Sequence, residues 1–379
     1  MKLSSKPPIL VIVSHDFGEF AYAYDFTRIL EDTYHVRLAL PQHIFKNNKN
    51  LVNFHCIEYG SDNDILEIYK NLNPEYILLF SAFLLVPNKV FSLKSLRNFI
   101  STATRDKKII ITTDPFLGLA GSINVSDVNL SITDTSDNIF FQYIRKHLTC
   151  RQFHEIHTVL MNIPCLLPFG LGHLNADSKY YSYYNNNPGT NSENSNDNPY
   201  WLFVISEIDY SLQKKNVGES KYTKYLLDKL SETSNFNKRP VVVAPLPLLK
   251  KIKKIKPSVE YIYRCNVIEH KLLITNAERV FYWNMISHSI YHRMINYKPV
   301  HFFDRGHIYS MFPRIHDAAI RCYYQGNEPV ILNYSKPLCI DTLISNNEQF
   351  YSSHASDLEK LRDLPSSMAL LHSLKHPQP

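Results

Sequence analysis

Short apolar runs alternate with amphipathic stretches through the first half of the chain. The apolar runs are rich in β-branched and aliphatic residues, which predicts strands buried on both faces of a parallel sheet. The stretches between them carry apolar residues at helical spacing. The predicted strands are Ile9–Val13, His35–Leu40, Phe54–Tyr59, Tyr76–Phe80 and Lys108–Thr113. The predicted helices are Glu19–Glu31, Asp64–Leu72 (with Asp62 or Asp64 as N-cap), Phe91–Thr102 and Asn138–Met161.

The second half of the chain repeats this alternation after a polar segment. Residues 179–200 contain almost no aliphatic side chain, which is typical of a linker or loop. The predicted strands beyond it are Trp201–Ile205, Pro240–Ala244, Val259–Tyr263, Arg279–Trp283 and Val300–Phe303. The predicted helices are Tyr222–Leu230, Val267–Thr275, Ser287–Tyr297 and Pro313–Tyr324.

The alternation predicts an α/β protein of two Rossmann-like, doubly wound domains facing a cleft. The expected boundaries are 1–178 for the first domain, 179–200 for the linker, 201–349 for the second domain, and 350–379 for a C-terminal helix and tail. Ligands of such sheets bind beyond the carboxyl ends of the strands. Candidate functional residues are therefore those that directly follow a predicted strand.

Glycine is scarce, with 10 residues in 379, and this excludes several nucleotide-binding classes. No G-x-G-x-x-G or G-x-x-x-x-G-K-[ST] pattern occurs, which argues against a standard dinucleotide fold, a P-loop NTPase and a protein kinase. A phosphate group would have to be held without a glycine-rich loop.

The net charge and the lengths of the apolar runs argue against a nucleic-acid-binding protein and against a membrane-spanning protein. The net charge of +6 is too small to indicate a nucleic-acid partner, and the whole excess lies in residues 181–379. The longest apolar run, Tyr76–Pro87, has 12 residues and is too short to span a bilayer. The sequence contains no C-x-x-C pattern, so it gives no indication of a structural metal site. We expect a cytoplasmic protein without transmembrane segments.

The loop after the first strand carries a histidine and two carboxylates. His15, Asp16 and Glu19 stand where a parallel strand ends and a helix begins. A neutral His15 there could remove a proton from a substrate hydroxyl, with Asp16 or Glu19 orienting the ring. The alternative is that Asp16 only caps the helix and His15 lies near the surface.

Asp114 follows another predicted strand, Lys108–Thr113. It stands where a polar group of an acceptor site would lie. The sequence Asp114-Pro115 also favours an Asx-Pro turn, and the two interpretations are compatible.

The segment from Arg279 to Gly306 holds the largest group of candidate binding residues. A helix N-terminus after the strand Arg279–Trp283 offers unpaired N–H groups and a positive dipole to a phosphate. Serine hydroxyls there would add donors, and a carboxylate after the next strand could accept hydrogen bonds from sugar hydroxyls. The residues concerned are Asn284, Ser287, His288, Ser289 and Asp304.

Alternative interpretations of this segment stay open. The serines could be helix caps, and His288 and His292 could be helix-surface residues one turn apart. Histidines at that spacing can also bind a metal ion, but no H-E-x-x-H pattern or third ligand accompanies them, so we expect no metal site.

Two basic features lie between the predicted strands of the second half. Arg264 follows the strand Val259–Tyr263 and could pair with a phosphate or be an ordinary surface residue. The run Lys250–Lys256 has interleaved apolar residues. It could contact an anionic membrane surface, line a nucleotide cleft, or form a solvated helix face.

This arrangement resembles the GT-B class of glycosyltransferases, which use two Rossmann-like domains across a cleft. The segment from Val11 to His15, followed by a helix and the strand His35–Leu40, is similar to the first β-α-β unit of that class. Tyr297-Lys298-Pro299-Val300 resembles the G-K-P-V segment of its donor domain, with Tyr297 in place of glycine. The E-x(7)-E pattern of many retaining members is absent.

The resemblance implies a metal-independent transferase that takes a sugar from a nucleotide-activated donor, without any other cofactor. His15 would be the base of an inverting reaction, supported by Asp16 or Glu19. Ser287–Ser289 and Arg264 would hold the diphosphate, Asn284 would lie beside them, Asp304 would bind the sugar, and Asp114 would lie on the acceptor side. The acceptor, which could be a glycan, a natural product or a protein, is not indicated. Alternatives are a non-catalytic nucleotide- or sugar-binding protein, a nucleotide-sugar epimerase of the same fold, and a membrane-surface interaction protein acting through Lys250–Lys256.

Overall fold

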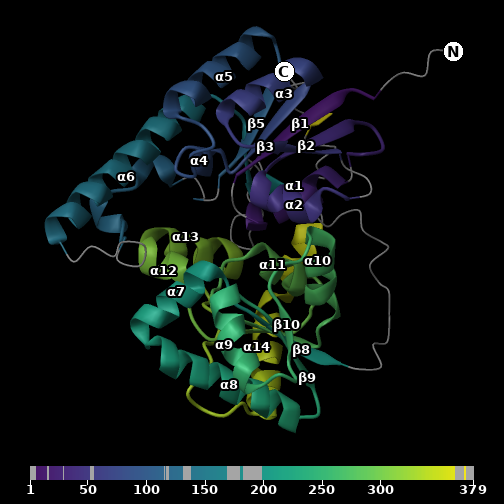
Figure 1. Cartoon of the computed structure of the whole chain (residues 1–379), viewed down its shortest axis with the longest axis vertical. Coiled ribbons are helices and arrows are strands. Elements are labelled where there is room, and N and C mark those ends of the chain that lie inside the picture. Colours follow the sequence, from purple (N-terminus) through teal and green to yellow (C-terminus); the bar gives the residue numbers. More distant parts are fainter. Residues whose placement is uncertain are drawn as a thin grey trace. The chain divides into compact units, whose positions relative to one another are not determined.

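The chain folds into two compact units in its computed structural model (Figure 1). The structure describes residues 6–14, 17–28, 30–51, 55–114, 116, 119–130, 138–168, 180–181, 199–362 and 371–372. Unit 1 comprises Met1–Val125, His147–Pro188 and Lys360–Pro379, and unit 2 comprises Ser126–Lys146 and Gly189–Glu359. Most of the predicted linker 179–200 lies outside the described residues, so the domain boundaries stay predictions.

Unit 1 is built on a parallel sheet of seven strands. The strand order is β3-β2-β1-β4-β5-β6-β7. The central strands β1 and β4 are almost wholly buried, as their unbroken apolar sequences predict. The strands are β1 Pro8–Val13, β2 His35–Pro41, β3 His55–Tyr59, β4 Tyr76–Phe80, β5 Ile109–Thr113, β6 Cys165–Pro168 and β7 Tyr180–Tyr181.

The helices of unit 1 follow its strands and bury their apolar faces. They are α1 Phe17–Arg28, α2 Gln42–Asn48, α3 Asp62–Leu72, α4 Ala82–Leu85, α5 Leu93–Arg105 and α6 Ile139–Leu160, of which α6 continues from unit 2 into unit 1. The predicted N-cap of α3 was wrong. Ser61 caps this helix by accepting from the backbone N of Asp64, whose carboxylate accepts from the backbone N of Ser61 in return. This reciprocal pair satisfies two helix donors, whereas an Asp cap alone would satisfy one.

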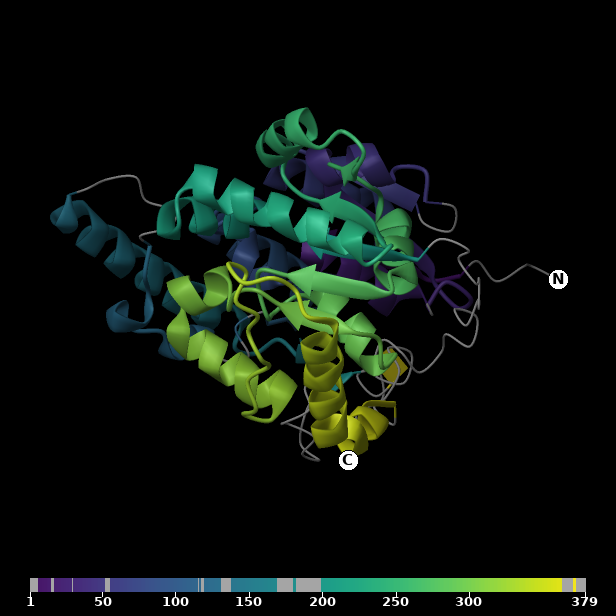
Figure 2. The ribbon, with the colours of Figure 1, turned by 90° about the horizontal axis from the view of Figure 1, so that it is seen from below.

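Unit 2 contains a second parallel sheet, with the strand order β10-β9-β8-β11-β12. Figure 2 shows its strands in green, with α14 in yellow. The strands are β8 Tyr200–Val204, β9 Arg239–Val243, β10 Glu260–Ile262, β11 Arg279–Tyr282 and β12 Val300–Phe302. The helices are α7 Glu207–Asn216, α8 Glu219–Asn235, α9 Leu246–Ile255, α10 Val267–Asn276, α11 His288–Ile295, α12 His307–Met311, α13 Pro313–Tyr324 and α14 Ile340–Arg362.

Aromatic rings fill the core of unit 2. Phe281 on β11 stacks on Phe203 of β8, with ring centroids 4.8 Å apart, and on Phe303 at 5.6 Å. Trp201 and Trp283 pack into the same cluster and are almost fully buried. Rings on adjacent parallel strands at such spacing add to the stability that burial of their area supplies.

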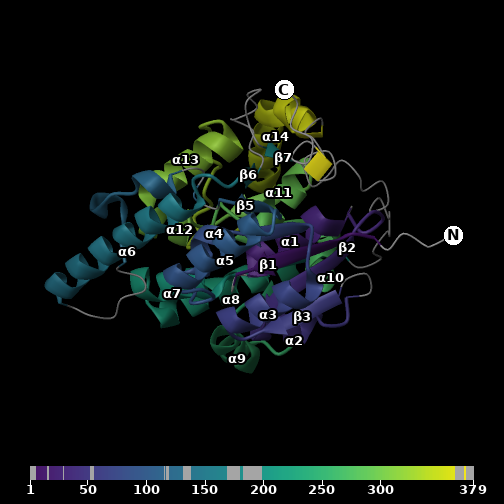
Figure 3. The ribbon, with the colours of Figure 1, turned by 90° about the horizontal axis from the view of Figure 1, so that it is seen from above.

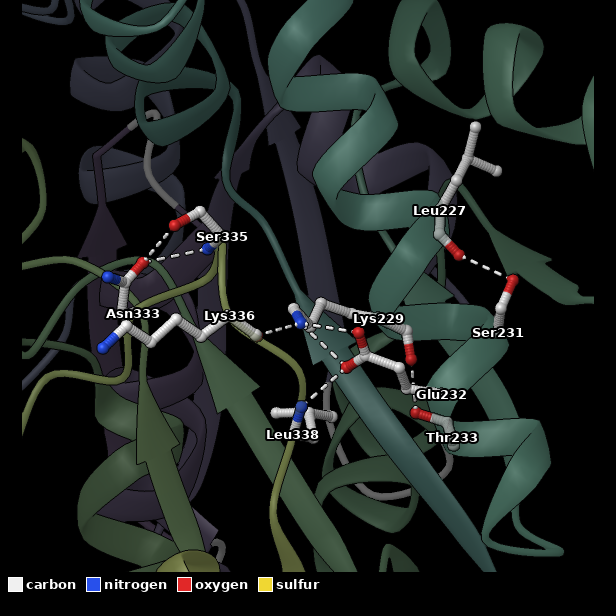
Figure 4. A network of polar contacts seen from close by, with 9 residues as sticks. All are labelled: Leu227, Lys229, Ser231, Glu232, Thr233, Asn333, Ser335, Lys336 and Leu338. Atoms are coloured by element: carbon white, nitrogen blue, oxygen red, sulfur yellow. Dashed lines mark hydrogen bonds and ion pairs between the residues drawn. The ribbon is translucent and has the colours of Figure 1, made fainter.

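A buried ion pair fixes α8 to the segment that leads into α14 (Figure 4). Lys229 is buried, and its Nζ donates to the two carboxylate oxygens of Glu232, at 2.9 and 2.8 Å, and to the carbonyl of Lys336. The backbone N of Leu338 donates to Glu232 Oε2 at 2.8 Å. The lysine charge is thus paired and hydrogen-bonded, which is the condition for burying it.

Each sheet has one place where the strand order reverses. In unit 1 the first strand, β1, lies between β2 and β4, and in unit 2 the first strand, β8, lies between β9 and β11. Loops that leave neighbouring strands in opposite directions open a crevice at such a switch point, and ligands of doubly wound sheets bind there. The predicted class, α/β with two Rossmann-like doubly wound domains, is confirmed.

We expect a buried histidine in unit 2 to make stability depend on pH. His301 is buried, its Nε2 lies 3.1 Å from Arg279 Nη1, and burial together with Arg279 and Arg293 lowers its pKa to about 3. A histidine in the unfolded chain titrates near 6.5, so below that pH the unfolded chain binds more protons and the free energy of unfolding falls. From pH 7 to pH 5.5 this site should cost about 1 kcal/mol.

The variant His301→Gln tests that expectation. The glutamine side-chain oxygen can accept from Arg279 but does not titrate. Urea unfolding at pH 7 and pH 5.5 should therefore show a loss smaller by about 1 kcal/mol in the variant than in the native protein. Equal losses in the two proteins would contradict the assignment.

Candidate functional site

The switch point of unit 1 gathers polar side chains from three strand ends. Ser81 follows β4, and its hydroxyl donates to the carboxylate of Glu19 in the first turn of α1. The backbone N of Ser81 donates to Thr113 Oγ1, at the end of β5, over 2.7 Å. Ser14, directly after β1, is fully buried. The structure therefore places the predicted residue Glu19 at the switch point, beside the end of β4; Figure 3 labels β1, α1, α4 and β5.

The predicted base and its first predicted partner, His15 and Asp16, lie outside the described residues. Their positions in the sequence put them between Ser14, which ends the β1 segment, and α1, which carries Glu19. Their roles stay predictions.

Asp114 makes the turn that its sequence indicates. Its Oδ1 accepts a hydrogen bond from the backbone N of Phe116 at 2.7 Å, and its side chain is buried after β5. This is the geometry of an Asx turn, so that interpretation is confirmed. The role of Asp114 on the acceptor side stays a prediction.

One buried carboxylate, Asp209, connects three strand-end loops of unit 2. It lies in the first turn of α7, after β8, and is fully buried. Its Oδ2 accepts from Ser206 Oγ at 2.6 Å and from Asn284 Nδ2 at 2.7 Å. Its Oδ1 accepts from His307 Nδ1 at 2.8 Å and from the backbone N of His307 at 3.3 Å. The loops after β8, β11 and β12 are thereby held together at the switch point.

The hydrogen bonds to Asp209 keep this carboxylate ionised in spite of its burial. Burial alone would raise the pKa of Asp209, but His307 and the donors of Ser206 and Asn284 outweigh that effect and lower the pKa below its usual value. A negative charge is therefore held inside unit 2 by donors from three loops.

Two of the predicted donor residues, Asn284 and Asp304, lie in this same cluster. Asp304 follows β12; its Oδ2 accepts from Gln213 Nε2 of α7 and its Oδ1 from the backbone N of Gly306, both at 2.8 Å. Gly306 has a φ of 88°, and a Cβ there would lie 2.4 Å from the Cβ of Asn284. The glycine thus allows the β12 loop to pass directly against Asn284.

The cluster includes buried acceptors without an internal partner. Among the residues that the structure describes, Asn284 Oδ1 and Gln213 Oε1 accept no hydrogen bond although both atoms are buried. An unsatisfied buried acceptor is costly, and a bound molecule with hydroxyl or amide donors would satisfy it.

Sequence reasoning missed Ser206, Asp209, Gln213 and His307. One signal was available, because Ser206 and Asp209 form an S-x-x-D pattern directly after a strand, which is typical of a helix N-terminus. His307 follows the Asp304-Arg305-Gly306 segment, but nothing in its spacing indicates a partner almost a hundred residues earlier.

The predicted phosphate-binding residues of α11 form a hydroxyl chain. Ser287 stands at the N-cap position, but its side chain makes no capping hydrogen bond, so its interpretation as a side-chain cap was wrong. Its Oγ lies 3.1 Å from that of Ser289, which accepts from Tyr282 Oη at 3.0 Å. The hydroxyls of Ser287 and Ser289 are therefore ordered by the end of β11.

The histidines of α11 are inside unit 2 and not on the helix surface. His288 and His292 are both buried, which contradicts their interpretation as surface residues. His292 Nε2 lies 2.8 Å from Thr275 Oγ1 of α10. In the described part of the chain no group of three or more His, Cys, Asp or Glu side chains could hold a metal ion.

The adjacent Arg293 stabilises the fold. It is fully buried, and its Nη atoms donate to the carbonyls of Ile274, Ala277, Glu278 and Pro299 at 2.6–3.1 Å. Burial lowers the pKa of Arg293 to about 10. These bonds join the loop before β11 to the loop before β12 and thereby position the amino ends of both strands, opposite the carboxyl ends that carry Asn284 and Asp304.

Arg264 lies away from the other predicted donor residues. It is exposed after β10, its guanidinium lies 4.8 Å from the ring centroid of Tyr263, and it donates to the hydroxyl of that residue. Two strands, β9 and β8, separate β10 from β11 in the sheet, which is about 14 Å at the usual strand spacing. The structure does not bring Arg264 together with Asn284 and Asp304.

The basic run Lys250–Lys256 covers the exposed side of α9. Leu248, Leu249 and Ile252 of that helix are buried in the core of unit 2. Lys251 forms an ion pair with Glu219. The peripheral membrane contact predicted for this run stays a prediction. Among the described residues, no helix is both long and apolar enough to cross a bilayer.

Known proteins resemble this chain in structure and not in sequence. No protein-family model matches it, and no curated protein does. The solved structure of the spinosyn forosaminyltransferase SpnP aligns with a TM-score of 0.53 at 11% identity, covering 98% of this chain and 99% of that one. Phytolacca americana UGT2, complexed with UDP-2-fluoro-glucose and pterostilbene, gives 0.53 at 10% identity, covering 98% and 99%.

A third solved structure agrees with the first two. The glycosyltransferase VinC, in complex with dTDP, aligns with a TM-score of 0.52 at 9% identity, covering 97% of this chain and 98% of its own. The likeness extends over both units and over nearly the full length of each neighbour. The chain therefore has the GT-B fold, and the expectation drawn from its sequence is confirmed for the fold.

Proposed function

We propose that this protein is a glycosyltransferase that moves a sugar from a nucleotide-activated donor to a hydroxyl or amine of an acceptor. The observation that carries the proposal is the structural likeness, over 97–98% of this chain, to transferases named for this chemistry. Two of these neighbours were solved with UDP-2-fluoro-glucose and with dTDP, which supports a nucleoside diphosphate as leaving group. The polar clusters at both switch points would supply part of the binding site.

Unit 2 would bind the donor. The hydroxyls of Ser287 and Ser289 and the ring of His288 lie at the start of α11, where a diphosphate would meet donors and the positive end of a helix dipole. The buried Oδ1 of Asn284 would accept from a hydroxyl of the donor, and Asp304 would accept from the sugar. Arg264 could reach the ligand only from the side of β10.

Unit 1 would bind and activate the acceptor. His15 would take the proton of the acceptor hydroxyl while that oxygen attacks the anomeric carbon, and the bond to the nucleoside diphosphate would break on the opposite face. The sugar would thus be transferred with inversion. Asp16 or Glu19 would orient the imidazole, Asp114 would lie on the acceptor side, and the helix dipole and donors of α11 would stabilise the leaving diphosphate without a metal ion.

Hydrolysis of nucleotide sugars by the purified protein tests the proposal. In a panel of UDP-, GDP-, dTDP-, CDP- and CMP-sugars, at least one compound should be hydrolysed slowly and should raise the Tm of the protein. Added EDTA should leave the rate unchanged. His15→Ala should lower transfer by about 10²- to 10⁴-fold while the donor-induced rise in Tm persists.

A pair of carboxylate variants gives the matched control. Asp304→Asn should weaken donor binding by about tenfold or more, because it removes a charged acceptor from the site. Asp341→Asn, at the exposed start of α14, should bind the donor normally. A rise in Tm without turnover would identify a non-catalytic binding protein, and no response to any nucleotide would refute the donor site.

A further inference from the structure

The first half of α6 carries a group of exposed apolar side chains (α6 is labelled in Figures 1 and 3). Ile139 is 82% exposed, Phe140 65% and Leu148 58%. At ~100° per residue, the exposed apolar side chains of this half fall within an arc of about 200° around the helix. They are, in order around the axis, Ile139, Tyr143, Phe140, Ile144, Leu148 and Phe141. We call these six residues the α6 apolar face.

The core of unit 1 does not account for this face. Phe153, Ile156 and Leu160, which the second half of α6 buries, fall outside the arc by the same ~100° rotation per residue. Phe153 packs against Phe116, with ring centroids 4.7 Å apart. The buried Cys150 falls inside the arc, near its Ile139 edge. Apart from Cys150, the helix buries one side in its second half and exposes apolar residues on the other side in its first half. Exposed apolar patches of this kind mark interaction sites.

Basic residues border the α6 apolar face on both sides. Lys146 falls about 20° beyond Ile139, and Arg145 about 40° beyond Phe141, at ~100° per residue. No acidic residue occurs from Asn138 to His154. Apolar and aromatic side chains flanked by cations match a lipid interface, where the rings enter the acyl boundary and the long cationic side chains reach the phosphates.

We propose that the first half of α6 docks this protein on an anionic membrane surface, with the α6 apolar face inserted at the interface. The charge complementarity between Arg145 and Lys146 and acidic lipid headgroups favours a membrane over a neutral apolar partner. This contact is independent of the proposed transferase activity. It also differs from the contact predicted for Lys250–Lys256, which would be electrostatic.

Sedimentation of the full-length protein with vesicles tests the proposal. We expect binding to vesicles of phosphatidylglycerol and phosphatidylcholine in equal parts, and much weaker binding to phosphatidylcholine alone. Phe140→Ser with Phe141→Ser should lower the partition coefficient at least tenfold, because two buried rings are lost. Arg145→Gln with Lys146→Gln should lower it roughly 25-fold on anionic vesicles, at about fivefold per charge.

Matched controls separate this face from other exposed residues. Leu272→Ser on α10 removes a side chain that is 52% exposed, and it should bind vesicles as the native protein does. Lys250→Gln with Lys253→Gln removes two charges from α9 and should have less effect than the Arg145 and Lys146 pair.

Three outcomes would overturn the proposal. The first is native binding by the Phe140 and Phe141 variant, and the second is equal binding to anionic and neutral vesicles. The third is a dimer of the native protein in size-exclusion chromatography that the Phe140 and Phe141 variant abolishes, because the face would then be an interface between two copies of this chain.

Discussion

Replacing Asp209 with alanine is expected to lower the free energy of unfolding by roughly 3–5 kcal/mol and to abolish donor binding. Asp209 is fully buried and accepts hydrogen bonds from Ser206, Asn284 and His307. Alanine would leave the buried donor of Asn284 and the partly buried donors of Ser206 and His307 without their acceptor, and a buried donor left unpaired costs about 1–3 kcal/mol. The loops after β8, β11 and β12 would lose the atom that joins them. Urea unfolding and nucleotide-induced shifts of Tm measure the two effects.

Two further variants define what Asp209 contributes. Asp209→Asn keeps the shape but loses the charge and turns one acceptor into a donor, so we expect a smaller loss of stability with donor binding still impaired. Asp228→Ala, at an exposed position of α8, should change stability by less than about 0.5 kcal/mol. Normal nucleotide binding by a folded Asp209→Ala protein would show that the cluster has no part in the donor site.

Gly306→Ala is expected to be the most damaging substitution among the glycines that the structure describes in unit 2. Two costs add at this position. The φ of 88° with a ψ of −174° is a conformation essentially confined to glycine, so a side chain there costs about 1–3 kcal/mol. The new Cβ would also lie 2.4 Å from Asn284 Cβ and 2.7 Å from its Cα, an overlap that typically costs another 1–3 kcal/mol. Because backbone atoms must move, the shift would displace Asn284 from Asp209.

The chain contains a matched control for the first of these costs. Gly218, like Gly306, is the N-cap of a helix, with a φ of 87° and a ψ of 138°, and a Cβ there would meet no atom within 4 Å. Gly218→Ala should therefore show the conformational cost alone and keep full donor binding. The difference between the two variants in free energy of unfolding, about 1–3 kcal/mol, measures the contact with Asn284. Equal losses in both would show that the β12 loop can move away from Asn284 at no cost.

The local sequence was sufficient for β1 to β5 of unit 1 and for β8 to β12 of unit 2. It did not predict β6 (Cys165–Pro168) or β7 (Tyr180–Tyr181), and β7 lies in the segment predicted as a linker or loop. The run Ile9–Val13 was predicted as a strand and is β1, from Pro8 to Val13. A continuous run of β-branched and aliphatic residues has apolar side chains on both faces of the strand, and both faces must be buried. Such a run therefore indicates a central strand of a parallel sheet. Capping was predicted less well, because Ser61 and Asp64 act as a pair and four polar residues in a row, Ser61 to Asp64, follow Gly60.

Helices that depend on tertiary contacts were harder to predict. The helix α7 carries Asp209 and Gln213, and its sequence after Ser206 is mostly polar. The one strong indication of this helix is the S-x-x-D pattern at its start. That pattern predicts a helix N-terminus but not the burial of Asp209. The helix Asn138–Met161 was predicted, but which of its apolar residues pack against unit 1 depends on the packing of the rest of that unit.

The sequence by itself determined the α/β alternation, the two-domain organisation of the fold class and the strand ends at which to look for chemistry. The sequence predicted Glu19, Asn284 and Asp304 as candidate site residues because residues that follow the strands of a parallel sheet lie at the same edge of that sheet. Only the tertiary structure decided that Asp209 joins Asn284 to His307, that Arg264 lies at the far edge, and that His288 and His292 are buried. Those outcomes depend on strand order and on loops that meet across many intervening residues, and local patterns carry no information about either.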